Sequence, residues 1–291
     1  PQMSEPTPEE VIALARQRIA ARAAAPAPPA EARVERPWLW LLSGLLAVLL
    51  GALLFWPGAP LEWKMYAVVH GVCAQQHNIT LGGAQFPLCA RNSGIYISFL
   101  LTAVYLYAIG RGRAGGLPPK GLSATLVAFV VIMGVDGFNS LFVDLGRPHL
   151  YEPNNLLRTL TGMGMGVSIA VMLHLVVNKT LRKNVDDSQP ILKSWWELLG
   201  ILAIDFLVLV AIYANLWLLY WPLAFTAFFG ITGVLYVVSL LLTSLVMGYE
   251  GRVTSLRQLA RPAAVALAPT LLILGSMSWL RFWLEAQGLP L

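Results

Sequence analysis

Long apolar stretches separated by short polar segments dominate the pattern along this chain. A helix that spans a membrane needs about 20 mostly apolar residues, and seven stretches meet that requirement. The uncharged run from Phe206 to Tyr249 is too long for one span, so Trp221-Pro222 is taken as the break between two helices. The predicted spans are Trp38–Trp56, Ser93–Gly110, Leu122–Val143, Thr159–Asn178, Trp196–Tyr220, Leu223–Gly248 and Ala263–Leu280.

The segments between these spans are short or polar. Leu61–Val72 is apolar but too short to span, which indicates an interfacial or re-entrant segment. Thr7-Pro8-Glu9-Glu10 is typical of a helix start, and a Pro/Ala-rich linker follows that helix. The predicted organisation is a cytoplasmic arm at 1–37, a four-helix module at 38–190 with an outer Cys/His loop at 57–92, and a three-helix module at 191–291.

Composition supports a membrane protein. Hydrophobic residues make up 57% of the chain and charged residues only 12%, whereas a soluble domain carries about 25% charged residues. The net charge of +5 does not indicate a nucleic-acid partner, because the basic residues fall in short segments between the spans. We therefore expect an all-α, polytopic helical protein in a lipid bilayer, placed in a bacterial inner membrane.

Basic residues in short loops predict the orientation, because Lys and Arg are enriched on the cytoplasmic side. With the N-terminus inside, 15 Lys and Arg residues fall on the cytoplasmic side and five on the outer side. This bias predicts a cytoplasmic N-terminus and an extracytoplasmic C-terminus. It also places the Cys/His loop outside.

Cys73 and Cys89 are the only cysteines of the chain and both lie in that outer loop. The outer side of a bacterial membrane is oxidising, so a structural disulfide is the simplest interpretation, and closing the loop would contribute about 3 kcal/mol. Two unreactive thiols and a redox pair are the alternatives. Redox pairs usually occur as Cys-x-x-Cys, and here Asn92 stands three positions after Cys89.

A metal site is a further alternative for the same loop. Cys73, His77 and Cys89 supply ligands that zinc or iron accepts, with His70 or His149 as a fourth. Scattered ligands of this kind form a weaker signal than paired Cys-x-x-Cys motifs.

The end of the third predicted span carries a second group of polar residues. Asp136, Asn139 and Ser140 share one helical face. A carboxylate inside a membrane helix should face protein or a wet cavity, and Arg158 is the expected ion-pair partner of Asp136 or Asp144. The group indicates either a structural ion pair or a polar pocket for an anionic headgroup or small ligand. Its candidate residues are Asp136, Asn139, Asp144, Asn155, Arg158 and Arg91.

Two features lie deeper in the predicted spans. Asp205 is an isolated charge near the middle of the fifth span, which favours either a proton or ion site or a protonated carboxyl bonded to another helix. Gly162 and Gly166 form a small-residue pattern that predicts close helix packing.

Several of these motifs together resemble a known family. Pro87-Leu88-Cys89-Ala90-Arg91 followed by Gly94-Ile95-Tyr96, then Asp136-Gly137-Phe138-Asn139, then Arg158-Thr159-Leu160-Thr161-Gly162, is similar to the bacterial predicted membrane proteins of domain-of-unknown-function family 2085. The resemblance covers about residues 65–175. Ala74 and Asn92 stand where the family has a His and a second Cys. The family has no established activity, so the resemblance implies a membrane protein without implying a mechanism.

Three functions are consistent with this sequence. The favoured hypothesis is an accessory or scaffold subunit of a membrane complex, with a disulfide-stapled outer loop. The second is a binding protein or transporter for a small ligand, lipid headgroup or ion. A metal-dependent membrane enzyme of the outer face is the least favoured of the three.

Overall fold

The computed structural model describes residues 33–73 and 77–288. All of these lie in one unit, Ala32–Leu291. The predicted N-terminal helix and most of the linker lie outside the described residues. The helices and strands described below therefore all belong to the two predicted membrane modules.

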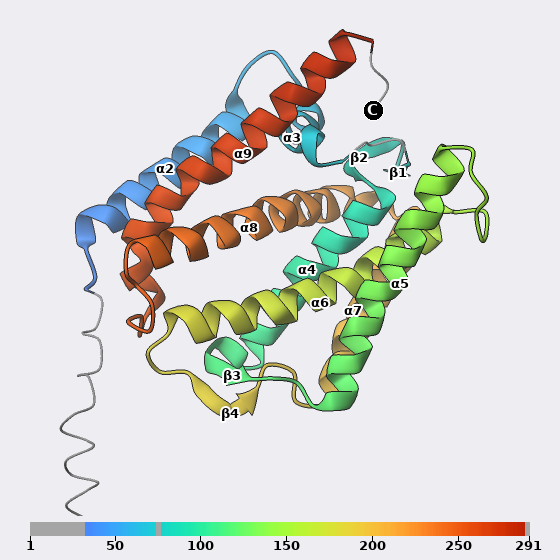
Figure 1. Ribbon diagram of the computed structural model, residues 1–291. Helices are drawn as coiled ribbons and strands as arrows, with labels where there is room; N and C mark the ends of the chain where they lie inside the picture. Colours follow the sequence, from blue (N-terminus) through green and yellow to red (C-terminus); the bar gives the residue numbers. More distant parts are fainter. Residues whose placement is uncertain (1–32, 74–76, 289–291) are drawn as a thin grey trace, which may run out of the picture. The chain divides into compact units, whose positions relative to one another are not determined.

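Seven long helices in the described ranges correspond to the seven predicted spans (Figure 1). Among the described residues, six are long and apolar enough to cross a membrane. The exception is the second helix, whose polar first turn begins Ala-Arg-Asn-Ser. The helices are α2 (Arg36–Phe55), α4 (Ala90–Ala108), α5 (Lys120–Asp144), α6 (Asn155–Leu181), α7 (Trp195–Tyr213), α8 (Tyr220–Val246) and α9 (Ala260–Ala286).

The break between α7 and α8 lies earlier than the sequence predicted. The helix α7 ends at Tyr213, and Asn215 adopts a left-handed conformation with φ 56°. Asn tolerates this conformation better than most residues, so it can end a helix. Pro222 instead lies in the first turn of α8, where the missing N–H of proline costs no helical hydrogen bond.

The helix α4 lies at the centre of the bundle, packed against α6 and α8 (Figure 1). Gly162 and Gly166 of α6 meet the α4 backbone so closely that an added Cβ would overlap the carbonyl oxygens of Arg91 and Ile95. Gly94 of α4 meets Thr159 of α6 in the same way. The predicted close packing is thus observed. The first half of α4, from Ala90 to Phe99, is mostly buried, so it tolerates a less apolar sequence than the outer helices.

The outer loop contains a β-hairpin that the all-α prediction missed. Strand β1 (Asn78–Leu81) pairs antiparallel with β2 (Ala84–Cys89). Gly82 and Gly83 connect them with φ values of 61° and 82°, as a tight two-residue hairpin turn requires. A second small sheet joins β3 (Ala114–Gly116) and β4 (Asp186–Pro190) in parallel. The described part of the protein is therefore mostly helical, with two two-stranded sheets.

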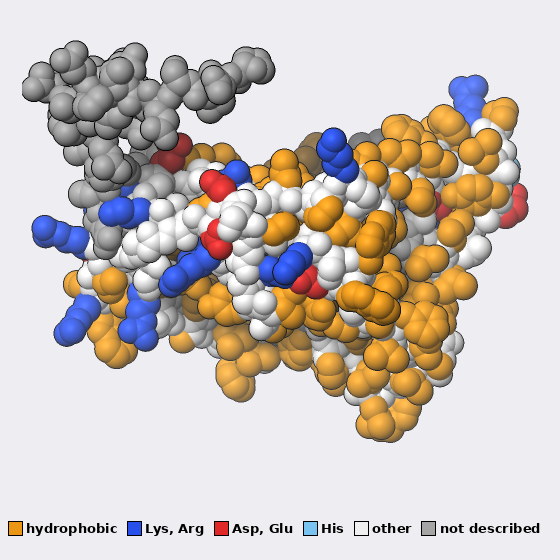
Figure 2. All heavy atoms as spheres, turned by 90° about the horizontal axis from the view of Figure 1, so that it is seen from below, with side chains coloured by type: hydrophobic (Ala, Val, Ile, Leu, Met, Phe, Trp, Pro, Cys, Tyr) orange, Lys and Arg blue, Asp and Glu red, His pale blue; other side chains and the backbone are white. Residues whose placement is uncertain are grey.

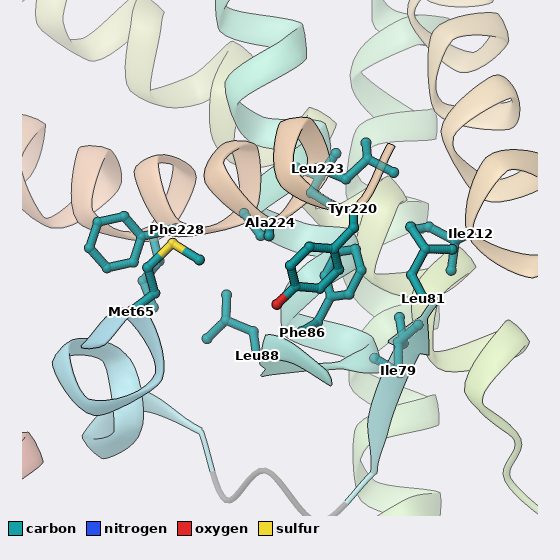
Figure 3. Packing of buried hydrophobic residues seen from close by; sticks show 14 of the residues in the cluster. Met65, Ile79, Leu81, Phe86, Leu88, Ile212, Tyr220, Leu223, Ala224 and Phe228 are labelled. Atoms are coloured by element: carbon teal, nitrogen blue, oxygen red, sulfur yellow. The ribbon is translucent and has the colours of Figure 1, made fainter. Parts of the chain in front are cut away.

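Side chains of the hairpin are anchored in a hydrophobic cluster. Ile79, Leu81, Phe86 and Leu88 are buried beside the first turns of α8 (Figure 3). The Tyr220 hydroxyl also donates to the Gln85 carbonyl oxygen at 2.9 Å.

The segment predicted to be interfacial or re-entrant forms a short helix, α3 (Leu61–Val69). Met65 and Val69 of α3 are fully buried and belong to the same cluster as the hairpin. This cluster contains residues from both predicted membrane modules, because α8 belongs to the second of them.

The two small sheets mark opposite ends of the bundle, called here the hairpin end (β1–β2) and the β3–β4 end (Figure 1). At the hairpin end, Asn155 at the start of α6 donates to the Asn78 carbonyl oxygen at 3.0 Å. At the β3–β4 end, Arg182 after α6 forms a β-bridge with Val253. Seen from below, this second end presents several Lys and Arg side chains (Figure 2).

Candidate functional site

A buried ion pair joins the start of α4 to α5 at the hairpin end. Asp136 is 1% exposed, and its Oδ2 accepts from Arg91 Nη2 at 2.6 Å and from Arg91 Nε at 3.2 Å. Arg91 Nη2 also donates to Ser140 Oγ at 2.8 Å. Two further hydroxyls donate to the same carboxylate, Tyr151 to Oδ1 at 2.8 Å and Thr161 to Oδ2 at 3.2 Å. The Asp136 carboxylate thus accepts from one guanidinium and two hydroxyls.

The predicted pairing of Arg158 with Asp136 or Asp144 is wrong. Arg158 is buried and its Nη1 donates to Asn155 Oδ1 at 3.2 Å. Its Nε has no hydrogen-bond partner among the described residues. Arg91 takes the place expected for Arg158, because the first turn of α4 lies directly against Asp136.

Asn139 holds the loop after α5. Its Nδ2 donates to the Tyr151 carbonyl oxygen at 2.8 Å, and its Oδ1 accepts from the Leu150 N–H at 2.7 Å. These bonds hold the loop so that the Tyr151 hydroxyl reaches the Asp136 carboxylate. Burial, together with the hydrogen bond to Asp136, raises the pKa of Tyr151 to about 12. Tyr151 therefore stays protonated and acts as a donor at neutral pH.

A cavity of about 270 Å³ lies beside this ion pair. It is enclosed by the end of the short 3₁₀ helix before the hairpin, the end of β2, the first turn of α4 and the last turns of α5. The cavity thus brings the cysteine loop together with the polar face of α5. Its lining residues are Val72, Cys73, His77, Cys89, Arg91, Asn92, Gly137, Ser140, Leu141 and Asp144.

The two cysteines meet in this cavity without an S–S bond. Both are thiols in the structure, so the predicted disulfide is not formed there. The Cys89 N–H donates to Cys73 Sγ at 3.4 Å. A side-chain hydrogen bond with Cys73, and then burial, raise the pKa of the Cys89 thiol well above its usual range.

The predicted metal site is not assembled. No group of three or more His, Cys, Asp or Glu side chains in the described ranges is placed to hold a metal ion. His70 instead contacts Glu285 of α9, with 2.9 Å between Nε2 and Oε2, and packs against the Phe282 ring. His77 lies 3.5 Å from Asp144 and His149 lies 3.0 Å from Glu152. Each predicted histidine ligand therefore faces a carboxylate partner.

Asp205 lies in α7, away from the residues that line the cavity. It is 4% exposed and accepts from Ser98 Oγ of α4 at 2.7 Å. Its second oxygen, Oδ1, has no hydrogen-bond partner in the described part of the chain. Asp205 thus links α7 to α4 through this hydrogen bond.

The sequence interpretation did not identify Tyr151 and Thr161 as part of this site. Thr161 carried one usable signal, since its spacing of three from Arg158 places both on one face of α6. The sequence around Tyr151 gave no such signal, because the position of Tyr151 depends on the hydrogen bonds by which Asn139 holds the loop after α5.

Comparison with known proteins supports the family resemblance over the part of the chain that builds this cavity. An uncharacterized protein of Methanothermobacter thermautotrophicus (strain Delta H) is 29% identical over 110 residues, which cover 35% of this chain and 86% of the relative. No solved structure matches. Every cavity-lining residue except Val72 lies within residues 73–172. Those residues match the family model described as "Predicted membrane protein (DUF2085)", which confirms the predicted resemblance.

Proposed function

We propose that this multi-pass membrane protein binds a small ligand bearing an oxyanion group, such as a carboxylate or phosphate, in the cavity at the hairpin end. The observation that carries the proposal is the cavity itself, in which a guanidinium, an imidazole and a hydroxyl face one space of about 270 Å³. Binding sites commonly combine such a concavity with a few convergent polar groups.

Arg91 supplies the main recognition group. Its Nε and Nη2 donors are engaged by Asp136 and Ser140. Its Nη1 donors have no acceptor among the described residues, and the side chain is 21% exposed. A guanidinium held by one carboxylate and open on its other side can bind an oxyanion through charge-assisted hydrogen bonds.

Nearby charges affect how strongly this cavity would bind an anion. A second buried guanidinium, Arg158, lies near Arg91 without an ion-pair partner among the described residues. The Asp144 carboxylate would repel an anion, but its side chain is 40% exposed and its Oδ1 lies 3.5 Å from His77 Nε2. Removing the Asp144 charge should therefore strengthen binding, by about fivefold if the repulsion is about 1 kcal/mol.

The cavity-filling variant Gly137→Leu tests the proposal. Gly137 lines the cavity, and an added Cβ there meets no atom within 4 Å, so the leucine side chain can enter the space without a backbone clash. Gly134→Leu is the matched control, because Gly134 lies one turn earlier on α5, is equally open, and does not line the cavity.

Binding is measured by calorimetric titration of purified protein in detergent with oxalate and inorganic phosphate. The proposal expects at least one of these anions to bind the unmodified protein and Gly134→Leu. It expects the same anion to bind Asp144→Asn more tightly and to lose measurable affinity for Gly137→Leu. Equal binding to both leucine variants, or no binding of either anion, would overturn the proposal.

We also propose that the hairpin end faces outward from a bacterial inner membrane. The gathering of Lys and Arg at the β3–β4 end supports this orientation, because such residues are enriched on the cytoplasmic side (Figure 2). His70, in the 3₁₀ helix that precedes the hairpin, contacts Glu285 at the end of α9, which supports the same proposed outer side for that helix end.

Single cysteines introduced into a Cys73→Ser/Cys89→Ser background test this orientation. The reporters replace exposed polar residues: Gln85 in the hairpin, Gln287 after α9 and Ser188 in β4. In intact cells, an impermeant maleimide should label Gln85→Cys and Gln287→Cys and leave Ser188→Cys unlabelled until the membrane is permeabilised. The reverse labelling pattern would contradict the proposed orientation.

The prediction of an accessory subunit stays a prediction, since the fold and the relatives say nothing of partner proteins. Co-purification in mild detergent tests it. A stable stoichiometric companion would support that role, and a protein that runs alone in every mild detergent would contradict it.

A further inference from the structure

We propose that Cys73 and Cys89 form a thiol–disulfide exchange pair that opens into the cavity, with Cys73 as the attacking thiol and Cys89 as the resolving thiol. The inference goes beyond oxyanion binding and does not depend on it. It also differs from a permanent structural disulfide, because it requires a small disulfide from outside the protein to reach Cys73 and requires the Cys73–Cys89 bond to be reducible.

The fold brings the two cysteines together across 16 positions of sequence. Cys73 follows a short 3₁₀ helix at His70–Val72, whereas Cys89 ends β2 and precedes α4. The hairpin returns the chain so that the Cys89 N–H points at Cys73 Sγ, 3.4 Å away. This arrangement replaces the local turn that positions the two thiols in a Cys-x-x-Cys motif.

The hydrogen bonds distinguish the two thiols. Cys73 Sγ accepts from the Cys89 N–H, and the two side chains are also hydrogen-bonded to each other. Donors aimed at a sulfur favour its thiolate. The same contact, together with burial, raises the pKa of the Cys89 thiol. Asn92 and Arg91 lower that pKa by smaller effects. Because the Cys89 N–H donates to Cys73 Sγ, we assign Cys73 as the attacking thiol.

Both cysteines line the cavity, and the cavity is the proposed route by which a reagent reaches the buried Cys73 thiol. The Cys73 thiolate attacks one sulfur of a low-molecular-weight disulfide, whose S–S bond breaks and releases one thiolate, which takes a proton from solvent. Cys89 then loses its proton and attacks the Cys73 sulfur of the mixed disulfide, releasing the second thiol. The two cysteines are oxidised to one disulfide, and the small disulfide is reduced to two thiols.

Oxidised glutathione is the probe, and intact mass after maleimide labelling is the measurement on the full chain in detergent. The chain holds only two cysteines, so each label reports on this pair. The unmodified protein should lose both labels together with oxidised glutathione and regain both with dithiothreitol. Cys89→Ser should trap the mixed disulfide on Cys73 at least about tenfold faster than Cys73→Ser traps it on Cys89, since only the thiolate attacks.

Three outcomes would overturn the inference. If both thiols still react with maleimide after treatment with oxidised glutathione, exchange does not occur. If the cysteines take no maleimide even after dithiothreitol, they form a permanent structural disulfide. Equal or faster trapping on Cys89 contradicts the assignment of roles. Size-exclusion profiles confirm that each variant is folded before its rate is compared.

A second comparison tests the hydrogen bond to Cys73 without removing that thiol. Cys89→Ser keeps a side-chain donor, whereas Cys89→Ala removes it. The pH profile of Cys73 alkylation should therefore lie at higher pH in Cys89→Ala than in Cys89→Ser. Identical profiles would contradict the proposed stabilisation of the Cys73 thiolate.

Discussion

Replacing Asp136 by asparagine is expected to destabilise the fold strongly. The carboxylate is 1% exposed and accepts from Arg91, Tyr151 and Thr161. The amide side chain of the Asp136→Asn variant keeps the shape but leaves the Arg91 guanidinium without its counter-charge. Removing one partner of a buried ion pair typically costs about 3–5 kcal/mol. Because the Arg91 side chain is 21% exposed, water can compensate in part, and we expect a loss of about 3 kcal/mol, the lower end of that range.

The matched control is Asp144→Asn, one carboxylate further along α5. The Asp144 side chain is 40% exposed and lies 3.5 Å from His77, so its loss should cost less than about 1 kcal/mol. Equilibrium unfolding in mixed micelles measures the free energy of unfolding of both variants against the unmodified protein.

A double-mutant cycle completes this test. Arg91→Met and Asp136→Leu should each destabilise alone, and the two combined should recover part of the loss, because no buried charge then remains. Equal stabilities of Asp136→Asn and Asp144→Asn would show that the buried Asp136–Arg91 pair does not stabilise the fold. Strictly additive effects in the cycle would show the same.

Three further predictions concern the helix contacts. Gly166→Ala should lower the free energy of unfolding by about 1–3 kcal/mol, because its Cβ would overlap the Ile95 carbonyl. In the control Gly233→Ala the added Cβ meets nothing within 4 Å, so this variant should be more stable by about 0.5–1 kcal/mol. Equal effects of the two substitutions in the same unfolding assay would contradict the close packing. Tyr151→Phe should cost about 1 kcal/mol by removing one donor to Asp136, and a neutral result would show that the loop bond adds nothing. Asp205→Asn should lower the free energy of unfolding by no more than about 1 kcal/mol, since the amide carbonyl can still accept from Ser98. A larger loss of stability in Asp205→Asn than in Asp205→Leu would exclude the proposed role of this hydrogen bond between helices.

The membrane helices were predictable because hydropathy depends on local sequence. The predicted spans correspond to the observed helices, and the pattern of Gly162 and Gly166 correctly indicated close packing. The boundary at Trp221-Pro222 was misplaced because a proline is compatible with a first helical turn. The decisive residue, Asn215, ends the helix through its left-handed backbone conformation, which hydropathy does not report.

The hairpin was missed although its signal is present in the sequence. Asn78–Leu81 and Ala84–Cys89 flank a Gly-Gly pair, which is a standard hairpin signal. The partners of the site residues were less accessible to prediction. Arg91 lies 45 residues from Asp136, and His70 lies 215 residues from Glu285. Such pairs depend on which helix ends become neighbours, and a single sequence does not give that arrangement.

The cavity beside Arg91 and Asp136 is proposed to hold an oxyanion. The most direct measurement is an anomalous difference map from crystals of the protein grown with selenate, an oxyanion that can be located by its scattering. We expect a selenium peak in the cavity, placed so that a selenate oxygen accepts from Arg91 Nη1, in the unmodified protein and in Gly134→Leu, and no such peak in Gly137→Leu. Selenate found only at other surfaces, or a cavity peak that persists in Gly137→Leu, would contradict oxyanion binding in this cavity.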